Sequence, residues 1–172
     1  MKRPITILST TVFAFALSSA AIADEAQQKG VNAIEEKSEE AAKEEAFDVE
    51  VNLTGTDTMQ YDKKTFTVEV GKKVKLTFKN IGTLPKAAMG HNVVILKKGS
   101  NKITYAVAAI SAGPASDYMP AAMKDQVLAN TKLLGPGEEE SIIFTVPEKG
   151  SYEYLCTFPG HFALMSGTML VK

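Results

Sequence analysis

Apolar and polar residues alternate in short segments over most of the chain. The first clear case runs from Phe47 to Leu53, where every second residue is apolar. A period of two is typical of a strand with one buried face. Similar runs follow between turns rich in glycine and proline, at residues 65–70, 74–78, 91–96, 141–146, 152–156 and 168–171. About seven or eight such strands in ~125 residues predict an all-β fold, a Greek-key β-sandwich.

Residues 119–130 depart from this pattern. Ala, Met, Lys, Gln and Leu dominate there, and these residue types favour helices. We therefore expect a short helix inserted between two strands at this point.

The first 23 residues have the pattern of a secretory signal peptide. Lys2 and Arg3 precede an apolar stretch around residues 5–17, and small residues then lead to Ala21-Ile22-Ala23. The apolar stretch is shorter than the ~20 residues that a membrane-spanning helix needs. The pattern predicts cleavage after Ala23, a periplasmic protein, and no membrane span in the mature chain.

Residues 24–46 differ in charge from the rest of the mature chain. They contain eight acidic residues and three lysines, whereas residues 47–172 contain 14 lysines and 12 acidic residues, a formal charge of +2. We expect an acidic flexible or helical tail at 24–46, with a partner-binding helix as the alternative, followed by one domain at 47–172. The net charge of −1 gives no support for nucleic-acid binding, which needs a basic surface.

Residues 156–165 carry the candidate chemistry. Cys156, His161 and Met165 place a thiolate, an imidazole and a thioether within ten residues, and Pro159-Gly160 provides a turn between them. Sulfur donors suit copper(I), and imidazole suits both oxidation states. Each residue alone is typical of a protein core. The chain has one cysteine and two histidines, and together with His91 they predict one metal site.

The Cys-x4-His-x3-Met spacing, with Cys-Thr-Phe-Pro-Gly-His and then Ala-Leu-Met, resembles the copper loop of the azurins. Residues 84–86 (Leu-Pro-Lys), 89–92 (Met-Gly-His-Asn) and 131–133 (Thr-Lys-Leu) are similar to the same family. The resemblance covers about residues 57–172. It implies a cupredoxin-like fold, one copper ion in a type 1 site, and transfer of single electrons.

The resemblance also implies a ligand set. The strong ligands would be His91, Cys156 and His161, with Met165 as a weak axial ligand and the backbone carbonyl of Gly90 opposite it. Asn92 and Thr157 match positions that tie the two ligand segments together by hydrogen bonds, which orient ligands and tune the metal.

The sequence departs from the azurin pattern at several positions. It lacks the cysteines for a disulfide near the start of the domain. Asn80 and Asn130 stand where the family has histidines, so we expect no pH response at the former. Phe162 follows His161 where a small polar residue is common, and we expect it to make the surface around His161 more apolar.

The resemblance favours an electron carrier over three alternatives. The expected partners are redox proteins, such as c-type cytochromes or copper or haem reductases, docking at an apolar patch around His161 made of Leu84, Met89, Phe158, Pro159, Phe162 and Leu164. A copper enzyme would need further histidines, so we expect no enzyme activity. A copper storage protein or chaperone would use the same ligands and remains open. A structural zinc site is weaker, because Met is not among the usual zinc ligands.

Overall fold

The computed structural model describes residues 46–172. The predicted signal peptide and, except for Ala46, the acidic tail lie outside the described residues. The described strands are β1 (Val49–Thr56), β2 (Gln60–Tyr61), β3 (Thr65–Val68), β4 (Lys73–Asn80), β5 (Val94–Leu96), β6 (Val127–Asn130), β7 (Glu139–Thr145), β8 (Gly150–Leu155) and β9 (Ser166–Val171).

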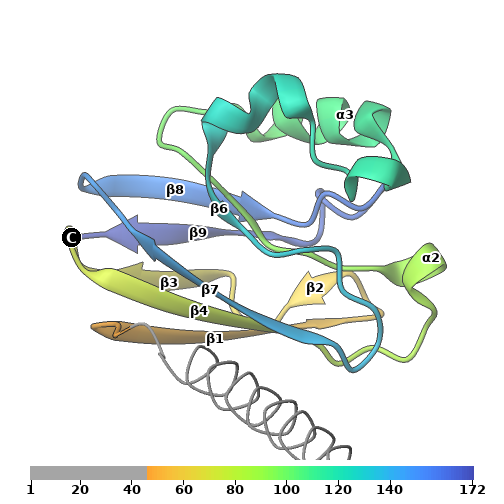
Figure 1. The fold of residues 1–172 in the computed structure, drawn as a ribbon, viewed down its shortest axis with the longest axis horizontal. Coiled ribbons are helices and arrows are strands. Elements are labelled where there is room, and N and C mark those ends of the chain that lie inside the picture. The colour runs from red at the N-terminus through yellow and green to blue at the C-terminus, as the bar shows by residue number, and fades with distance from the viewer. Residues whose placement is uncertain (1–45) are drawn as a thin grey trace, which may run out of the picture. The chain divides into compact units, whose positions relative to one another are not determined.

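These strands form two sheets that face each other (Figure 1). One sheet has the order β2-β1-β4-β7, and the other has the order β3-β9-β8-β5-β6. β1 pairs with β4 and β3 pairs with β9 in parallel, while the other strand pairs are antiparallel. The predicted β-sandwich is confirmed.

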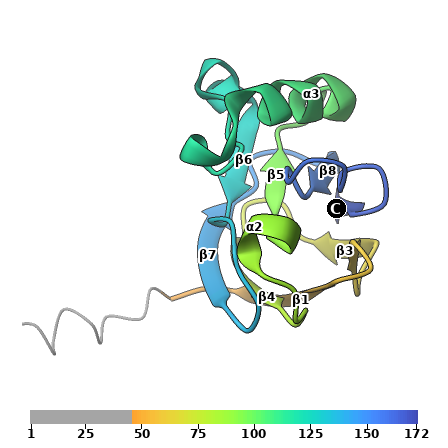
Figure 2. The same ribbon diagram turned by 90° about the vertical axis from the view of Figure 1, so that its right-hand side faces the viewer.

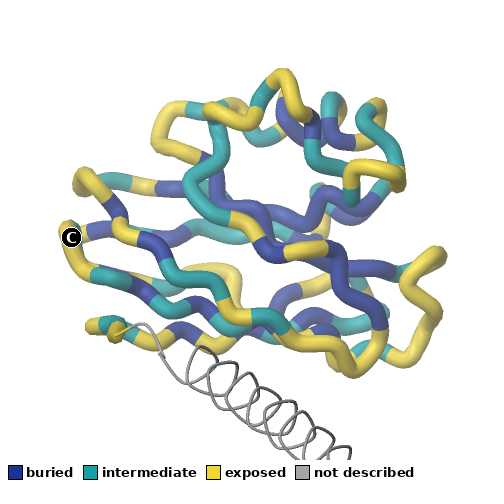
Figure 3. The backbone as a smooth tube through the Cα atoms, in the orientation of Figure 1, coloured by how far each residue is buried: buried dark blue, intermediate teal, exposed yellow. Residues whose placement is uncertain are grey.

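The core lies between the two sheets. Buried residues alternate with more exposed ones along β1 and β4 (Figure 3), as the sequence pattern predicts. Leu53, Leu76 and Phe78 from one sheet and Tyr152 and Met169 from the other are at most 2% exposed. Burying side chains of this size contributes about 1.5–3 kcal/mol each, so this layer holds the two sheets together.

The longest described helix is one that the sequence pattern did not predict. The long helix is α3 (Lys102–Ala112), and it packs over the face of the five-stranded sheet (Figure 2). Asn101 caps it, because its side-chain oxygen accepts a hydrogen bond from the Thr104 N–H at 2.9 Å. Tyr105, Ala106 and Ala109 form its buried face.

The short helix expected within residues 119–130 is present as a 3₁₀ helix that covers only the first half of that stretch. That stretch contains a 3₁₀ turn, η2 (Ala121–Gln126), in which Met123 is non-helical, and then the edge strand β6. A short helix α2 (Lys86–Met89) and a 3₁₀ turn η1 (Pro114–Ser116) complete the described elements. Among residues 46–172, no helix has the length and apolar content to cross a membrane.

Candidate metal centre

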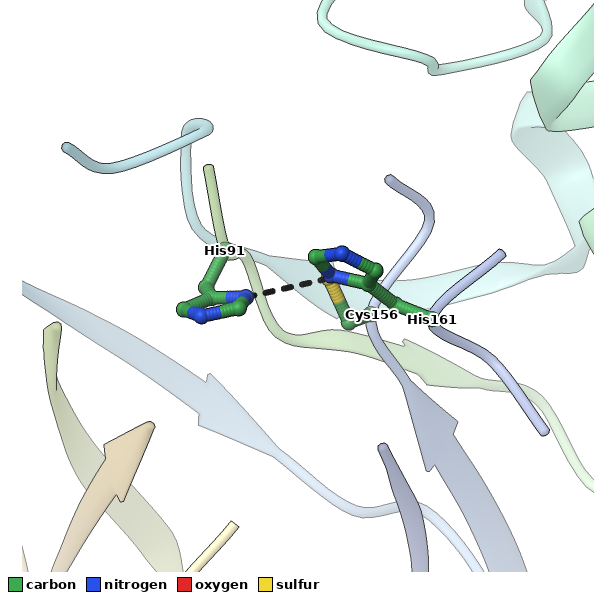
Figure 4. Close-up of side chains that lie close together, drawn as sticks. All are labelled: His91, Cys156 and His161. Atoms are coloured by element: carbon green, nitrogen blue, oxygen red, sulfur yellow. Dashed lines mark hydrogen bonds between the residues drawn. The ribbon is translucent and has the colours of Figure 1, made fainter. Parts of the chain in front are cut away.

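His91, Cys156 and His161 meet at one end of the sandwich. Their ligand atoms all lie within 4.8 Å of one another, and all three residues are buried. Cys156 Sγ lies 3.5 Å from Nδ1 of His161 and 4.0 Å from Nδ1 of His91. Figure 4 shows the His91 ring facing the Cys156 thiol and the His161 ring, which come from other segments of the chain.

Different segments position the three residues. Cys156 directly follows β8. His161 lies in a turn, where its N–H donates to the Phe158 carbonyl at 3.1 Å, and Gly160 has a φ of 82° that glycine adopts without strain. His91 precedes β5 rather than starting it, and its N–H and carbonyl bond to Leu134 at 3.0 and 2.7 Å.

Met165 and Gly90 lie next to this cluster. Met165 is fully buried. Its N–H donates to the His161 carbonyl at 2.7 Å, and its carbonyl accepts from the Cys156 N–H at 3.0 Å. The Gly90 carbonyl oxygen lies 4.0 Å from Cys156 Sγ. The backbone therefore ties all the predicted ligand residues of the loop to one another.

The predicted hydrogen bonds between Asn92 and Thr157 are present. The Asn92 side-chain amide donates to Thr157 Oγ1 at 2.7 Å, and its oxygen accepts from the Thr157 N–H at 2.9 Å. The Asn92 carbonyl also accepts from the Tyr61 hydroxyl at 2.5 Å. No motif in the sequence marks Tyr61 or Leu134 as supports of the site, because their bonds go to backbone atoms of distant segments.

Burial keeps the three donor side chains neutral in the metal-free protein. It raises the pKa of the Cys156 thiol to about 12. It lowers the pKa of His161 to about 4, with His91 as a smaller cause. Burial also lowers the pKa of His91, against the opposing influence of the Thr56 backbone and Asp57. These are the shifts expected where the charged form loses hydration.

The donor set fits a first-row metal ion. Ligand atoms that share such an ion in one plane at about 2.0–2.3 Å lie about 3.5–3.8 Å from one another, close to the observed sulfur-to-nitrogen distances. The set of two imidazoles, one thiolate and a neighbouring thioether is typical of copper. Nδ1 is the ring nitrogen by which each of His91 and His161 faces the sulfur.

Aromatic side chains lie around His161. His161 is only 2% exposed. The Phe158 ring lies against it at a tilt of 37° with ring centres 4.6 Å apart, and Tyr118 contacts Phe158 edge-on at 5.3 Å. Phe162 packs against a second core cluster below α3, with Leu96, Tyr105 and Leu155 among its members. Phe162 is only partly buried, so its contribution to the apolar surface around His161 stays a prediction.

Other residues of the predicted patch are exposed. Leu84 is 43% and Leu164 is 52% exposed. Asp57 fixes the loop that carries Leu84, because its carboxylate accepts from the Thr83 N–H at 2.8 Å and the Thr83 hydroxyl at 2.9 Å. Asn80 is buried, and its side chain donates to the Leu134 carbonyl at 3.1 Å, which gives a non-titrating group at that position.

Comparisons with known proteins point to the same chemistry. The profile of the copper binding proteins of the plastocyanin/azurin family matches residues 47–172. An azurin from Alcaligenes faecalis is 40% identical over 124 residues, which are 70% of this chain and 95% of that protein. Auracyanin-A from Chloroflexus aurantiacus is 36% identical over 125 residues, 72% of this chain and 74% of that one.

Solved structures agree with the sequence relatives. A dithionite-reduced auracyanin from Roseiflexus castenholzii matches with a TM-score of 0.65 and 39% identity, over 74% of this chain and 99% of that chain. The fold, the buried donor cluster and these similarities have one explanation. The chain belongs to the plastocyanin/azurin family of copper-binding proteins, and copper is its cofactor.

Proposed function

We propose that this protein is a periplasmic type 1 blue-copper protein that carries single electrons between redox partners. The observation that carries the proposal is the convergence of one cysteine sulfur and two imidazoles within 4.8 Å in a buried site. In the proposed ligand set, His91, Cys156 and His161 would hold the copper ion strongly, and Met165 and the Gly90 carbonyl would hold it weakly. The bound copper ion supplies one-electron chemistry between its two oxidation states.

The protein's own part in this function is to hold the ligands still. The Asn92–Thr157 bonds fix the segment of His91 against the segment of Cys156. The Leu134 bonds fix the backbone of His91. A site whose ligands are locked by packing and hydrogen bonds keeps its geometry when the charge of the metal changes. This rigidity favours rapid transfer of an electron over chemistry that rearranges ligands.

The proposed electron port is His161 together with Phe158, the aromatic ring in contact with it. Phe158 contacts the imidazole and Tyr118 contacts Phe158, and His161 is only 2% exposed, so we expect a partner to dock over Phe158 and its neighbours. Leu84 and Leu164 give apolar area beside it. Apolar patches of this kind favour brief docking with another protein, and the proposed partners are redox proteins such as c-type cytochromes or copper or haem reductases.

The remaining parts of the proposal rest on the sequence. The basic and apolar pattern of residues 1–23 supports export, with a mature chain of an acidic tail at 24–46 and a copper domain at 47–172. Both histidines are used by the proposed ligand set, which leaves no imidazole for a second metal and supports a carrier rather than an enzyme.

Copper loading of the purified mature protein tests the proposal. We expect an intense thiolate-to-copper absorption, a type 1 paramagnetic resonance spectrum and reversible one-electron voltammetry. A copper store would instead favour one oxidation state and pass its metal quickly to a chelator. A colourless copper complex, or irreversible voltammetry with fast metal loss, would contradict the proposed carrier function.

A further inference from the structure

Gly55 lies against the end of the Met165 side chain with no room for a side chain of its own. Gly55 is near the end of β1. A Cβ atom at this position would lie 2.6 Å from Met165 Cε and 2.9 Å from Phe78 Cζ. Both distances are far inside the ~3.5–4.0 Å of normal carbon contacts. A glycine inside a strand is typical of a place where another group approaches the backbone closely.

Space alone, and not backbone conformation, requires glycine at position 55. The described glycines with positive φ are Gly71, Gly99, Gly113, Gly137, Gly150 and Gly160. Gly55 is not among them, so alanine can adopt its backbone conformation without strain. A substitution at Gly55 therefore acts through the atoms that its Cβ would meet.

The backbone of Gly55 has no freedom to retreat from Met165. It lies between Asn80 of β4 and Tyr61 of β2 in the sheet register. Its carbonyl accepts a hydrogen bond from the Ile81 N–H at 2.9 Å. Phe78, which contacts the same point, is fully buried. The backbone of β1 at Gly55 is therefore held in place in contact with the Met165 methyl group.

The other end of the Met165 side chain is fixed as well. The Met165 N–H bonds to the His161 carbonyl, and the Met165 carbonyl bonds to the Cys156 N–H. The Met165 main chain is thus tied to two donor residues, while the methyl group rests on Gly55. The thioether sulfur lies between these two ends, so the contact of the methyl group with Gly55 restricts the positions that the sulfur can occupy.

We propose that Gly55 is a positioning residue for the axial thioether. By having no Cβ, it leaves the space in which the Met165 methyl group lies while the sulfur faces the metal. The inference rests on the proposed function, because it takes Met165 as the axial ligand. The axial ligand tunes the reduction potential of such sites, so a methyl group added at position 55 changes the potential through Met165.

A double-mutant cycle tests whether a substitution at Gly55 changes the reduction potential through Met165. Gly55→Ala is made in the wild-type protein and in a Met165→Leu background, and the reduction potential and paramagnetic resonance spectrum of all four copper-loaded proteins are measured. We expect Gly55→Ala to shift the potential in the wild-type background, and the shift to fall at least threefold in the Met165→Leu background, where no axial sulfur remains to be moved. Phe78→Leu is the matched control, because it disturbs the same core point without adding an atom against Met165.

A measurement without copper tests the contact itself. In metal-free protein labelled at the methionine methyl groups, Gly55→Ala should move the Met165 methyl resonance more than that of any other buried methionine, such as Met169. If Gly55→Ala does not fold, the double variant Gly55→Ala, Phe78→Leu removes the ring contact and is measured in the same way against Phe78→Leu.

The outcomes separate the two proposals. An unchanged potential in a folded Gly55→Ala protein, or equal shifts in both backgrounds, overturns the positioning role while the wild-type protein stays blue. Loss of the proposed function itself would be seen in the wild-type spectrum, before any variant is compared.

Discussion

Asn92 and Thr157 join the two ligand-bearing segments through two reciprocal hydrogen bonds of 2.7 and 2.9 Å, 65 residues apart in sequence. Asn92 follows His91 and Thr157 follows Cys156 in the chain. Both residues are at most 2% exposed. The pair therefore sets the distance between two donor residues without touching the metal position itself.

Asn92→Ala should destabilise the protein by about 2–3 kcal/mol, because the buried N–H and hydroxyl of Thr157 lose their partner. Chemical denaturation of metal-free and copper-loaded protein measures this change. Asn130→Ala is the control, since Asn130 is exposed and should change stability by less than about 0.5 kcal/mol. Equal effects of the two substitutions would contradict the role of the pair.

Cys156→Ser should remove the visible absorption, because the colour of a type 1 site arises from charge transfer between thiolate and copper. The single cysteine of the chain offers no replacement. The visible absorption spectrum of the copper-loaded variant measures this loss. A serine variant as blue as the wild type would show that Cys156 is not the ligand.

Met165→Leu should keep copper and colour but raise the reduction potential, because a weak donor to copper(II) is replaced by none. Voltammetry of the purified variant gives the shift. Met169→Leu is the matched control, because Met169 is equally buried and lies in β9, outside the ligand loop. An unchanged or lowered potential in Met165→Leu would count against an axial role.

The metal-free protein should lose stability as the pH falls from about 6.5 to 4. In the folded protein the pKa of His161 is lowered from 6.5 to about 4. Between these pH values the unfolded state therefore binds more protons than the folded state, and protonation favours unfolding. The stabilisation is complete above pH 6.5. The loss should be on the order of 1–3 kcal/mol, after allowance for solvent near the ring.

Denaturation of metal-free protein at several pH values measures this dependence, and His161→Gln should flatten it. Asp57 acts in a different window, because its lowered pKa gives stability that is lost only as the pH falls below its ordinary value of 3.8. A His161→Gln variant with the full pH dependence would show that another group is responsible.

Leu164→Asp should slow electron self-exchange at least about tenfold, or ~1.4 kcal/mol in barrier, because a charge at the proposed docking surface must lose its hydration on contact. The copper spectrum should not change, since Leu164 is not a ligand. Ile103→Asp on α3 is the control, as Ile103 is also exposed, at 62%. Equal rates in wild type and Leu164→Asp, with fast loss of copper to a chelator, would favour the storage alternative.

Phe162 illustrates why the surface was harder to predict than the site. Its place after His161 in the sequence predicts a surface position, and the partly buried side chain also packs against the core cluster below α3. Phe162→Glu is therefore expected to destabilise the fold rather than to disturb docking alone. Which side a loop residue faces depends on the inserted segment above it.

The strands of the sandwich could be predicted because one face of each is buried, which imposes a period of two on β1, β3 and β4. The helix α3 could not be placed, because Ile103, Thr104, Val107 and Ile110 are β-branched and have lower helix propensity. The cap at Asn101 was the available signal. Strand β2 has two residues, too few for any pattern.

The candidate site was easier to predict from the sequence than the helices, because its donors are rare residues at a fixed spacing. The chain has few cysteines and histidines to assign, and the loop supplies two of the three clustered donors. The supports of the site were not predictable, since Leu134 acts through its backbone and Gly55 through an absent side chain. Features of this kind are visible only in three dimensions.

The burial of Cys156 affects how readily its thiol reacts in the protein before copper is bound. An exposed, ionised thiol reacts readily with oxidants and with other thiols, whereas a buried, protonated one is inert. Cys156 is fully buried and its pKa is raised to about 12. The fold thus shields its single sulfur nucleophile from cross-linking and over-oxidation, so that a newly folded chain stays competent to receive its metal.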